Sequence, residues 1–142
     1  MADIPQAGSR RPRPLSPHMT IYRWPITMAA SITHRATGIA LAVGTLYVAW
    51  WLVAASSGPE SGAFELFRSI SSSLLGQLVL FGFVWSLAYH LFNGFRHIAW
   101  DLGFGFETRT ANILSFLIYG LSILVTVLAF ALVYAGKAGY FR

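Results

Sequence analysis

Three long apolar segments dominate the sequence and restrict what the chain can fold into. They cover about residues 36–55, 74–100 and 111–136, and the first and third contain no charged residue. Each is long enough to cross the ~30 Å hydrocarbon core of a bilayer, which takes about 20 residues as a helix. Because backbone groups in lipid must bond within their own segment, each should be helical. The predicted transmembrane helices cover about residues 31–55, 73–101 and 110–136.

Composition supports an all-α membrane protein. Of all residues 56% are hydrophobic and only 11% are charged, whereas a soluble domain has about 25% charged residues. The net charge is +5, and the basic residues are expected to flank the membrane helices. We therefore predict that the protein is surrounded by membrane lipid and has no nucleic-acid partner. The chain has no cysteine, which excludes disulfides and thiolate-held iron–sulfur clusters. Any metal centre must therefore use histidine or oxygen ligands.

Residues 1–30 are predicted to form an extended arm before a three-helix transmembrane domain, residues 31–142. The arm contains five of the six prolines, which fix φ and remove backbone donors. It is also rich in arginine, and the connection between the second and third helices carries Arg109, with Arg96 close by. Basic residues favour the cytoplasmic side. We therefore expect a cytoplasmic N-terminus and a periplasmic C-terminus. Since no signal or transit peptide is recognisable, the bacterial inner membrane is the expected location.

Histidine and arginine side chains occur inside the predicted helices, where they are costly and usually face a site or a cofactor. His34 and Arg35 lie at the start of the first helix, and His90 lies well inside the second. Arg96 and His97 follow His90 by about two turns. The two clusters have matching depth, which predicts one shared polar site near the cytoplasmic surface.

His90 has two interpretations. A neutral imidazole in lipid needs partners for its nitrogens, and these are either a neighbouring carbonyl, in a packing role, or a haem iron. Gly94, one turn on, would let a flat macrocycle approach the backbone. An electron-transfer haem usually has two axial ligands. Because the chain offers only one deep histidine, the second ligand would come from another subunit, and the protein is expected to be part of a heteromeric helix bundle.

Other polar residues near the same surface are candidates for binding the haem propionates or a carbonyl oxygen. The two propionates of a b-type haem require cations. Ser31 and Arg35 are one turn apart on the first helix, so both can donate to one carbonyl oxygen. Asp101 is expected to pair with an arginine, and the repeat of Ala36, Ala40 and Gly44 predicts a helix-packing face. The residues available to the propionates are His34, Arg35, Arg96 and His97.

Two stretches resemble signatures of a known family. The first comprises RPLSPH at 13–18, IYRWPIT at 21–27 and SITHRATG at 31–38, and the second is HLFNGFRHIAWDLG at 90–103. Together they resemble the cytochrome b membrane-anchor subunit of succinate dehydrogenase, the large anchor subunit of respiratory complex II. One departure is Thr33, where an aliphatic residue is expected.

The resemblance implies a role for each matching residue. His90 is the axial ligand of haem b, and a small hydrophobic anchor subunit supplies the other. Ser31 and Arg35 line the ubiquinone pocket, while His34 and Arg35, joined by His97, lie near the haem propionates. Arg96 and Asp101 support the site. The implied partners also include a flavoprotein that oxidises succinate to fumarate in the tricarboxylic acid cycle, and an iron–sulfur subunit that passes the electrons on to ubiquinone.

Two alternatives remain open from sequence alone. The chain could be the anchor of a quinol:fumarate reductase, because sequence does not fix the direction of electron flow. It could also be a non-redox structural subunit of a membrane complex, in which case its histidines are packing residues. A reduced b-type absorption band separates the two redox interpretations from the structural one.

Overall fold

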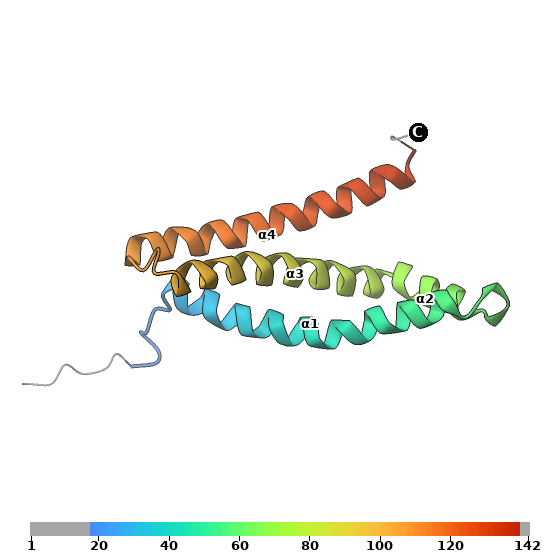
Figure 1. The fold of residues 1–142 in the computed structure, drawn as a ribbon, viewed down its shortest axis with the longest axis horizontal. Coiled ribbons are helices and arrows are strands. Elements are labelled where there is room, and N and C mark those ends of the chain that lie inside the picture. Colours follow the sequence, from blue (N-terminus) through green and yellow to red (C-terminus); the bar gives the residue numbers. More distant parts are fainter. Residues whose placement is uncertain (1–17, 140–142) are drawn as a thin grey trace, which may run out of the picture.

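The protein is all-helical in the computed structural model, which describes residues 18–139 (Figure 1). Three of its helices are long and apolar enough to cross a membrane, which confirms the three predicted spans. They are joined by short connections, and a small helical hairpin separates the first two. The elements are α1 (Ile26–Ser56), η1 (Pro59–Ser61), α2 (Ala63–Ser72), α3 (Leu74–Asp101) and α4 (Thr108–Lys137).

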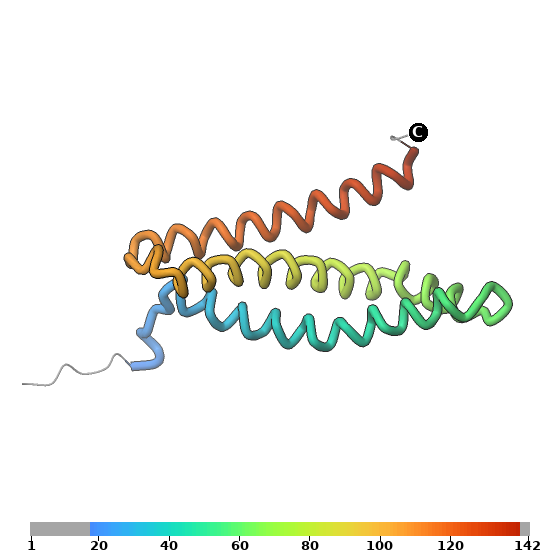
Figure 2. The backbone as a smooth tube through the Cα atoms, viewed as in Figure 1, coloured from blue at the N-terminus to red at the C-terminus, as the bar shows by residue number. Residues whose placement is uncertain are grey.

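The long helices form a layer in which α3 lies between α1 and α4 (Figure 1). The tube view in Figure 2 shows that α4 runs close to α3 near the α3–α4 connection and diverges from it towards the C-terminus. The segment that leads into α1 lies at the same end as the α3–α4 connection, and α2 lies at the opposite end. Arg23 and Arg109, which the sequence placed on one side of the membrane, therefore lie at the same end of the bundle.

Helix α1 begins at Ile26, five residues before the predicted start. Pro25 is the N-cap, with extended backbone angles, and its carbonyl accepts hydrogen bonds from the amides of Met28 and Ala29. Proline is well tolerated at a helix start, because the first amides have no partner inside the helix. The prediction assigned residues 26–30 to the proline-rich arm, whereas the helix begins directly after Pro25. Of the predicted arm, residues 1–17 lie outside the described part of the chain.

The short helix α2 was not predicted. It turns back onto α1 after two glycines with positive φ, Gly58 and Gly62, an angle that glycine adopts at little cost. The ring of Phe67 packs against Tyr47 at 5.2 Å and against Trp50 at 4.8 Å between centroids. These contacts fix α2 on the end of α1, so this connection is an ordered hairpin.

The surface is apolar and much of the interior is polar. The largest fully buried side chains include Tyr89, Asn93 and Thr126, together with Ser115 and Ser122, whereas most large aliphatic side chains of the long helices are exposed. A soluble domain buries such aliphatic residues. This distribution agrees with lipid as the surrounding solvent.

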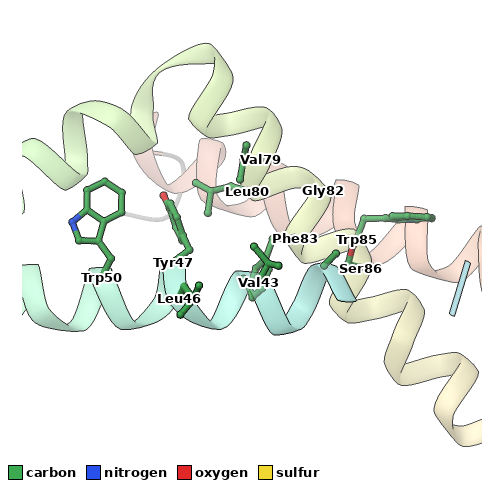
Figure 3. Close-up of a pocket in the computed structure, with 12 residues that line it drawn as sticks. Val43, Leu46, Tyr47, Trp50, Val79, Leu80, Gly82, Phe83, Trp85 and Ser86 are labelled. Atoms are coloured by element: carbon green, nitrogen blue, oxygen red, sulfur yellow. The ribbon is translucent and has the colours of Figure 1, made fainter. Parts of the chain in front are cut away.

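Helices α1 and α3 approach closely where the predicted packing face has its glycine. A Cβ atom on Gly44 would overlap the ring of Phe83, so a larger residue at this position requires the ring to move. Ala36, by contrast, is exposed in this chain. Beside the contact lies an apolar groove of about 800 Å³ between the two helices (Figure 3). Val43 and Tyr47 of α1 and Leu80 of α3 are among its lining residues.

Candidate functional site

Three histidines from two helices meet at the end of the bundle where α1 begins. The ring of His34 on α1 stacks on that of His90 on α3, with 3.9 Å between centroids and 15° between planes. His97, two turns along α3, lies 5.1 Å from His34 between centroids. The structure therefore brings together the two histidine clusters that their matching depth predicted.

His90 uses one ring nitrogen for packing and keeps the other available. Its Nδ1 lies 3.2 Å from the backbone carbonyl oxygen of His34. A carbonyl can only accept, so the hydrogen of the neutral ring is on Nδ1 and Nε2 carries a lone pair. Within residues 18–139, Nε2 has no hydrogen-bond partner. A ligating histidine commonly donates its second ring nitrogen to a carbonyl in this way, so the two interpretations of His90 are compatible.

The residues present fit a haem b bound through His90. The Nδ1 atom of His34 is buried and has no partner among the described residues, so it remains available to a carboxylate such as a propionate. A Cβ atom on Gly94 would meet nothing within 4 Å, which leaves open space one turn from His90. Within residues 18–139, the three histidines are not arranged so that they could hold one metal ion together. His90 is therefore suited to an iron whose other ligands come from elsewhere.

Ser31 and Arg35 form a pair on the first turns of α1. The Nη2 atom of Arg35 donates to Ser31 Oγ at 3.3 Å, as their spacing of four residues predicted. Arg35 is exposed and Ser31 is half-buried. Because Ser31 accepts in this contact, its own hydrogen remains available. A hydroxyl and a guanidinium thus stand together at the end of the membrane span.

The side chain of Arg96 points towards α4. It is buried, its Nη1 donates to Ser115 Oγ on α4 at 2.6 Å, and its guanidinium lies 4.5 Å from the ring centroid of Trp100. Such contacts keep a buried guanidinium partly satisfied. The rotation of α3 points this side chain towards α4, and the supporting role assigned to Arg96 stays a prediction.

The ion pair expected for Asp101 does not occur within residues 18–139. Asp101 is exposed at the end of α3, and the only salt bridge within residues 18–139 joins Arg68 to Glu65. Arg96, the nearest arginine in sequence, is held by Ser115 and Trp100 instead. The pairing of Asp101 with an arginine therefore stays a prediction.

A polar network between the three helices escaped the sequence analysis. Thr33 Oγ1 and Tyr119 Oη lie 2.6 Å apart, and Tyr89 donates to the carbonyl oxygen of Ala30 at 3.0 Å. Asn93 is fully buried, and neither of its amide atoms has a partner among the described residues. Residues 89, 93 and 96 are spaced at three and four along α3, a helical stripe that could have revealed this interior. Thr33, the departure from the family signature, connects α1 to α4.

Loss of the Ser115 hydroxyl should weaken the contact between α3 and α4. Ser115→Ala leaves the buried Arg96 Nη1 without its acceptor, and hydrogen bonds to charged groups contribute about 1.5–3 kcal/mol. We expect the free energy of unfolding of the subunit in detergent micelles to fall by that amount, followed by tryptophan fluorescence. Ser122→Ala is the matched control, because the buried Ser122 hydroxyl donates only to a carbonyl of its own helix. Equal effects of the two variants would contradict the assigned role.

Comparison with known proteins gives a consistent result. Residues 9–129 match the family described as succinate dehydrogenase/fumarate reductase transmembrane subunit. The succinate dehydrogenase cytochrome b556 subunit of Paracoccus denitrificans is 44% identical over 112 residues, which are 79% of this chain and 82% of the relative. The b556 subunit of Rickettsia typhi is 40% identical over 116 residues, 82% and 89% of the two chains. The mitochondrial cytochrome b560 subunit of Sus scrofa is 48% identical over 98 residues, 66% of this chain and 55% of that one.

Proposed function

The chain belongs to the succinate dehydrogenase/fumarate reductase transmembrane subunit family, as a cytochrome b membrane subunit of succinate dehydrogenase, and we propose that it binds haem b and helps form the ubiquinone-reduction site. The observation that carries this proposal is the state of His90. Its Nδ1 is anchored on the His34 carbonyl, which leaves the Nε2 lone pair for a metal.

For the haem, we assign His90 as the ligand from this subunit. Haem b, when bound, supplies a one-electron store at this depth of the membrane. His34, with its unpartnered Nδ1, and Arg35 are the groups that neutralise the propionates, and His97 lies beside them. The second axial ligand comes from another subunit, which the resemblance to the family identifies as a small hydrophobic anchor.

For the quinone, we assign Ser31 and Arg35 as the residues that hold one carbonyl oxygen. Reduction of ubiquinone to ubiquinol takes two electrons and two protons, and negative charge develops on the carbonyl oxygens as electrons arrive. A guanidinium and a hydroxyl aimed at that oxygen stabilise this charge. The start of α1 is also near water, which supplies the protons.

The source of the electrons is outside this chain. Oxidation of succinate to fumarate by a flavoprotein releases two electrons and two protons, and an iron–sulfur subunit passes the electrons to the quinone. This arrangement places the start of α1 at the cytoplasmic face, next to the iron–sulfur subunit, and the C-terminus in the periplasm. The bacterial inner membrane is the corresponding location.

Purification of the complex from its native membrane tests the function. We expect the chain to copurify with a flavoprotein, an iron–sulfur protein and a small membrane subunit, and the complex to show a reduced b-type band and succinate-dependent reduction of ubiquinone. Faster oxidation of menaquinol by fumarate would instead indicate a quinol:fumarate reductase. A complex without pigment would refute the haem assignment and favour a structural role.

A further inference from the structure

One turn of α1 surrounds the imidazole of His90 with groups that have no role so far. Thr37 is buried, and its Oγ1 lies 3.4 Å from His90 Nδ1. The same hydroxyl donates to the carbonyl oxygen of His34 at 2.9 Å. Its hydrogen is thus used, and its lone pairs are available to the Nδ1 hydrogen. His90 therefore faces two acceptors in one turn of the neighbouring helix.

Gly38, the next residue, gives the imidazole the room to reach these acceptors. A Cβ atom at position 38 would stand 3.1 Å from His90 Cε1 and 3.6 Å from Nδ1. The first distance is shorter than an ordinary carbon–carbon contact. A methyl group at this position would therefore push the ring away from α1 by a few tenths of an ångström, against the direction of its hydrogen bond.

We propose that Thr37 and Gly38 are positioning residues that set the orientation and basicity of His90 and thereby the midpoint potential of the haem. This inference rests on the proposed function of His90 as a haem ligand. Donation from Nδ1 to an acceptor makes the imidazole a stronger ligand. A stronger donor favours the ferric over the ferrous state, so weakening this hydrogen bond raises the potential.

The test uses the assembled complex and two variants, with a matched control for each. Gly38→Ala moves the ring and Thr37→Val removes an acceptor while the shape is nearly kept. Gly120→Ala is the control for the first, since a Cβ atom there meets nothing within 4 Å. Thr45→Val is the control for the second, because Thr45 donates only to a carbonyl of its own helix. Redox titration of the b-type band measures the potential, and electron paramagnetic resonance of the ferric haem reports the ligand field.

We expect Gly38→Ala to raise the ferrous-to-ferric ratio at a fixed potential by roughly 2- to 10-fold, the range of one hydrogen bond; tenfold is 59 mV for one electron. Thr37→Val should shift the ratio less, in the same direction, and Thr37→Ser should restore it. If Gly38→Ala prevents assembly, the two variants of Thr37 decide. Unchanged potentials and resonance spectra in a haem-containing complex would overturn this inference and leave the proposed function intact, whereas absence of haem from the unaltered complex would refute the proposed function itself.

Discussion

Replacing His90 by alanine is expected to remove the reduced b-type band from the purified complex. The substitution deletes the nitrogen that we assign to the iron. His34, whose ring lies 3.9 Å from that of His90 between centroids, is assigned to the propionates instead. Loss of an outer-shell partner alone typically lowers metal affinity by roughly 10–100-fold, so loss of the ligand itself should cost more. The measurement is the haem content per assembled complex.

The control for this experiment is His18→Ala. His18 is exposed, and among the described residues its ring forms a hydrogen bond within its own turn, to Thr20. Succinate oxidation with a soluble dye acceptor shows whether the soluble subunits are still attached. Full haem content in an assembled His90→Ala complex would show that the iron is held by other residues.

Replacing Arg35 by alanine is expected to lower succinate-dependent ubiquinone reduction by roughly 10²-fold, the effect of removing one preorganised donor from a developing negative charge. Ser31→Ala should have a smaller effect of up to about tenfold, since a neutral hydrogen bond contributes about 0.5–1.5 kcal/mol. Succinate oxidation with a soluble dye should persist in both variants, because the flavoprotein reaction precedes the quinone site. Both activities are measured on the same membranes.

Two controls separate a role at the quinone from a general effect of charge. Arg68→Ala removes an exposed arginine at the other end of the bundle, where Arg68 lies 4.0 Å from Glu65, and should leave quinone reduction unchanged. Arg35→Lys keeps the charge without the planar fork of guanidinium donors and should have an intermediate activity. Equal loss of quinone and dye activity in Arg35→Ala would instead indicate failed assembly.

The three spans could be predicted from the sequence because uncharged runs of this length have one stable form in lipid. The meeting of His34 with His90 could be predicted because depth along a helix follows from residue number. Helix α2 could not be predicted in this way, since it is short and amphipathic, with Glu65 and Arg68 on its polar side, and has no long uncharged run. Its order comes from the packing of Phe67 on α1, a contact between separate segments.

The sequence predicted the depth of each site residue along its helix, but not the direction in which its side chain points. The pair Ser31 and Arg35 followed from their spacing on one helix. The partner of Arg96 did not, because the rotation of α3 about its axis is set by packing against both neighbouring helices. The same rotation places Asn93 in the interior and leaves Asp101 exposed. Among the described residues, no arginine forms an ion pair with Asp101. Sequence position fixes the level of such a residue, whereas its partners depend on the neighbouring helices.

The most direct test of the central claim is an experimental density map of the complex in its membrane domain. We predict planar density for a porphyrin beside α3, with its iron bonded to Nε2 of His90 and an imidazole of another subunit on the opposite face. Nδ1 should remain on the carbonyl of His34. A map in which Nε2 of His90 bonds to a protein oxygen, with lipid in place of the ring, would contradict the account.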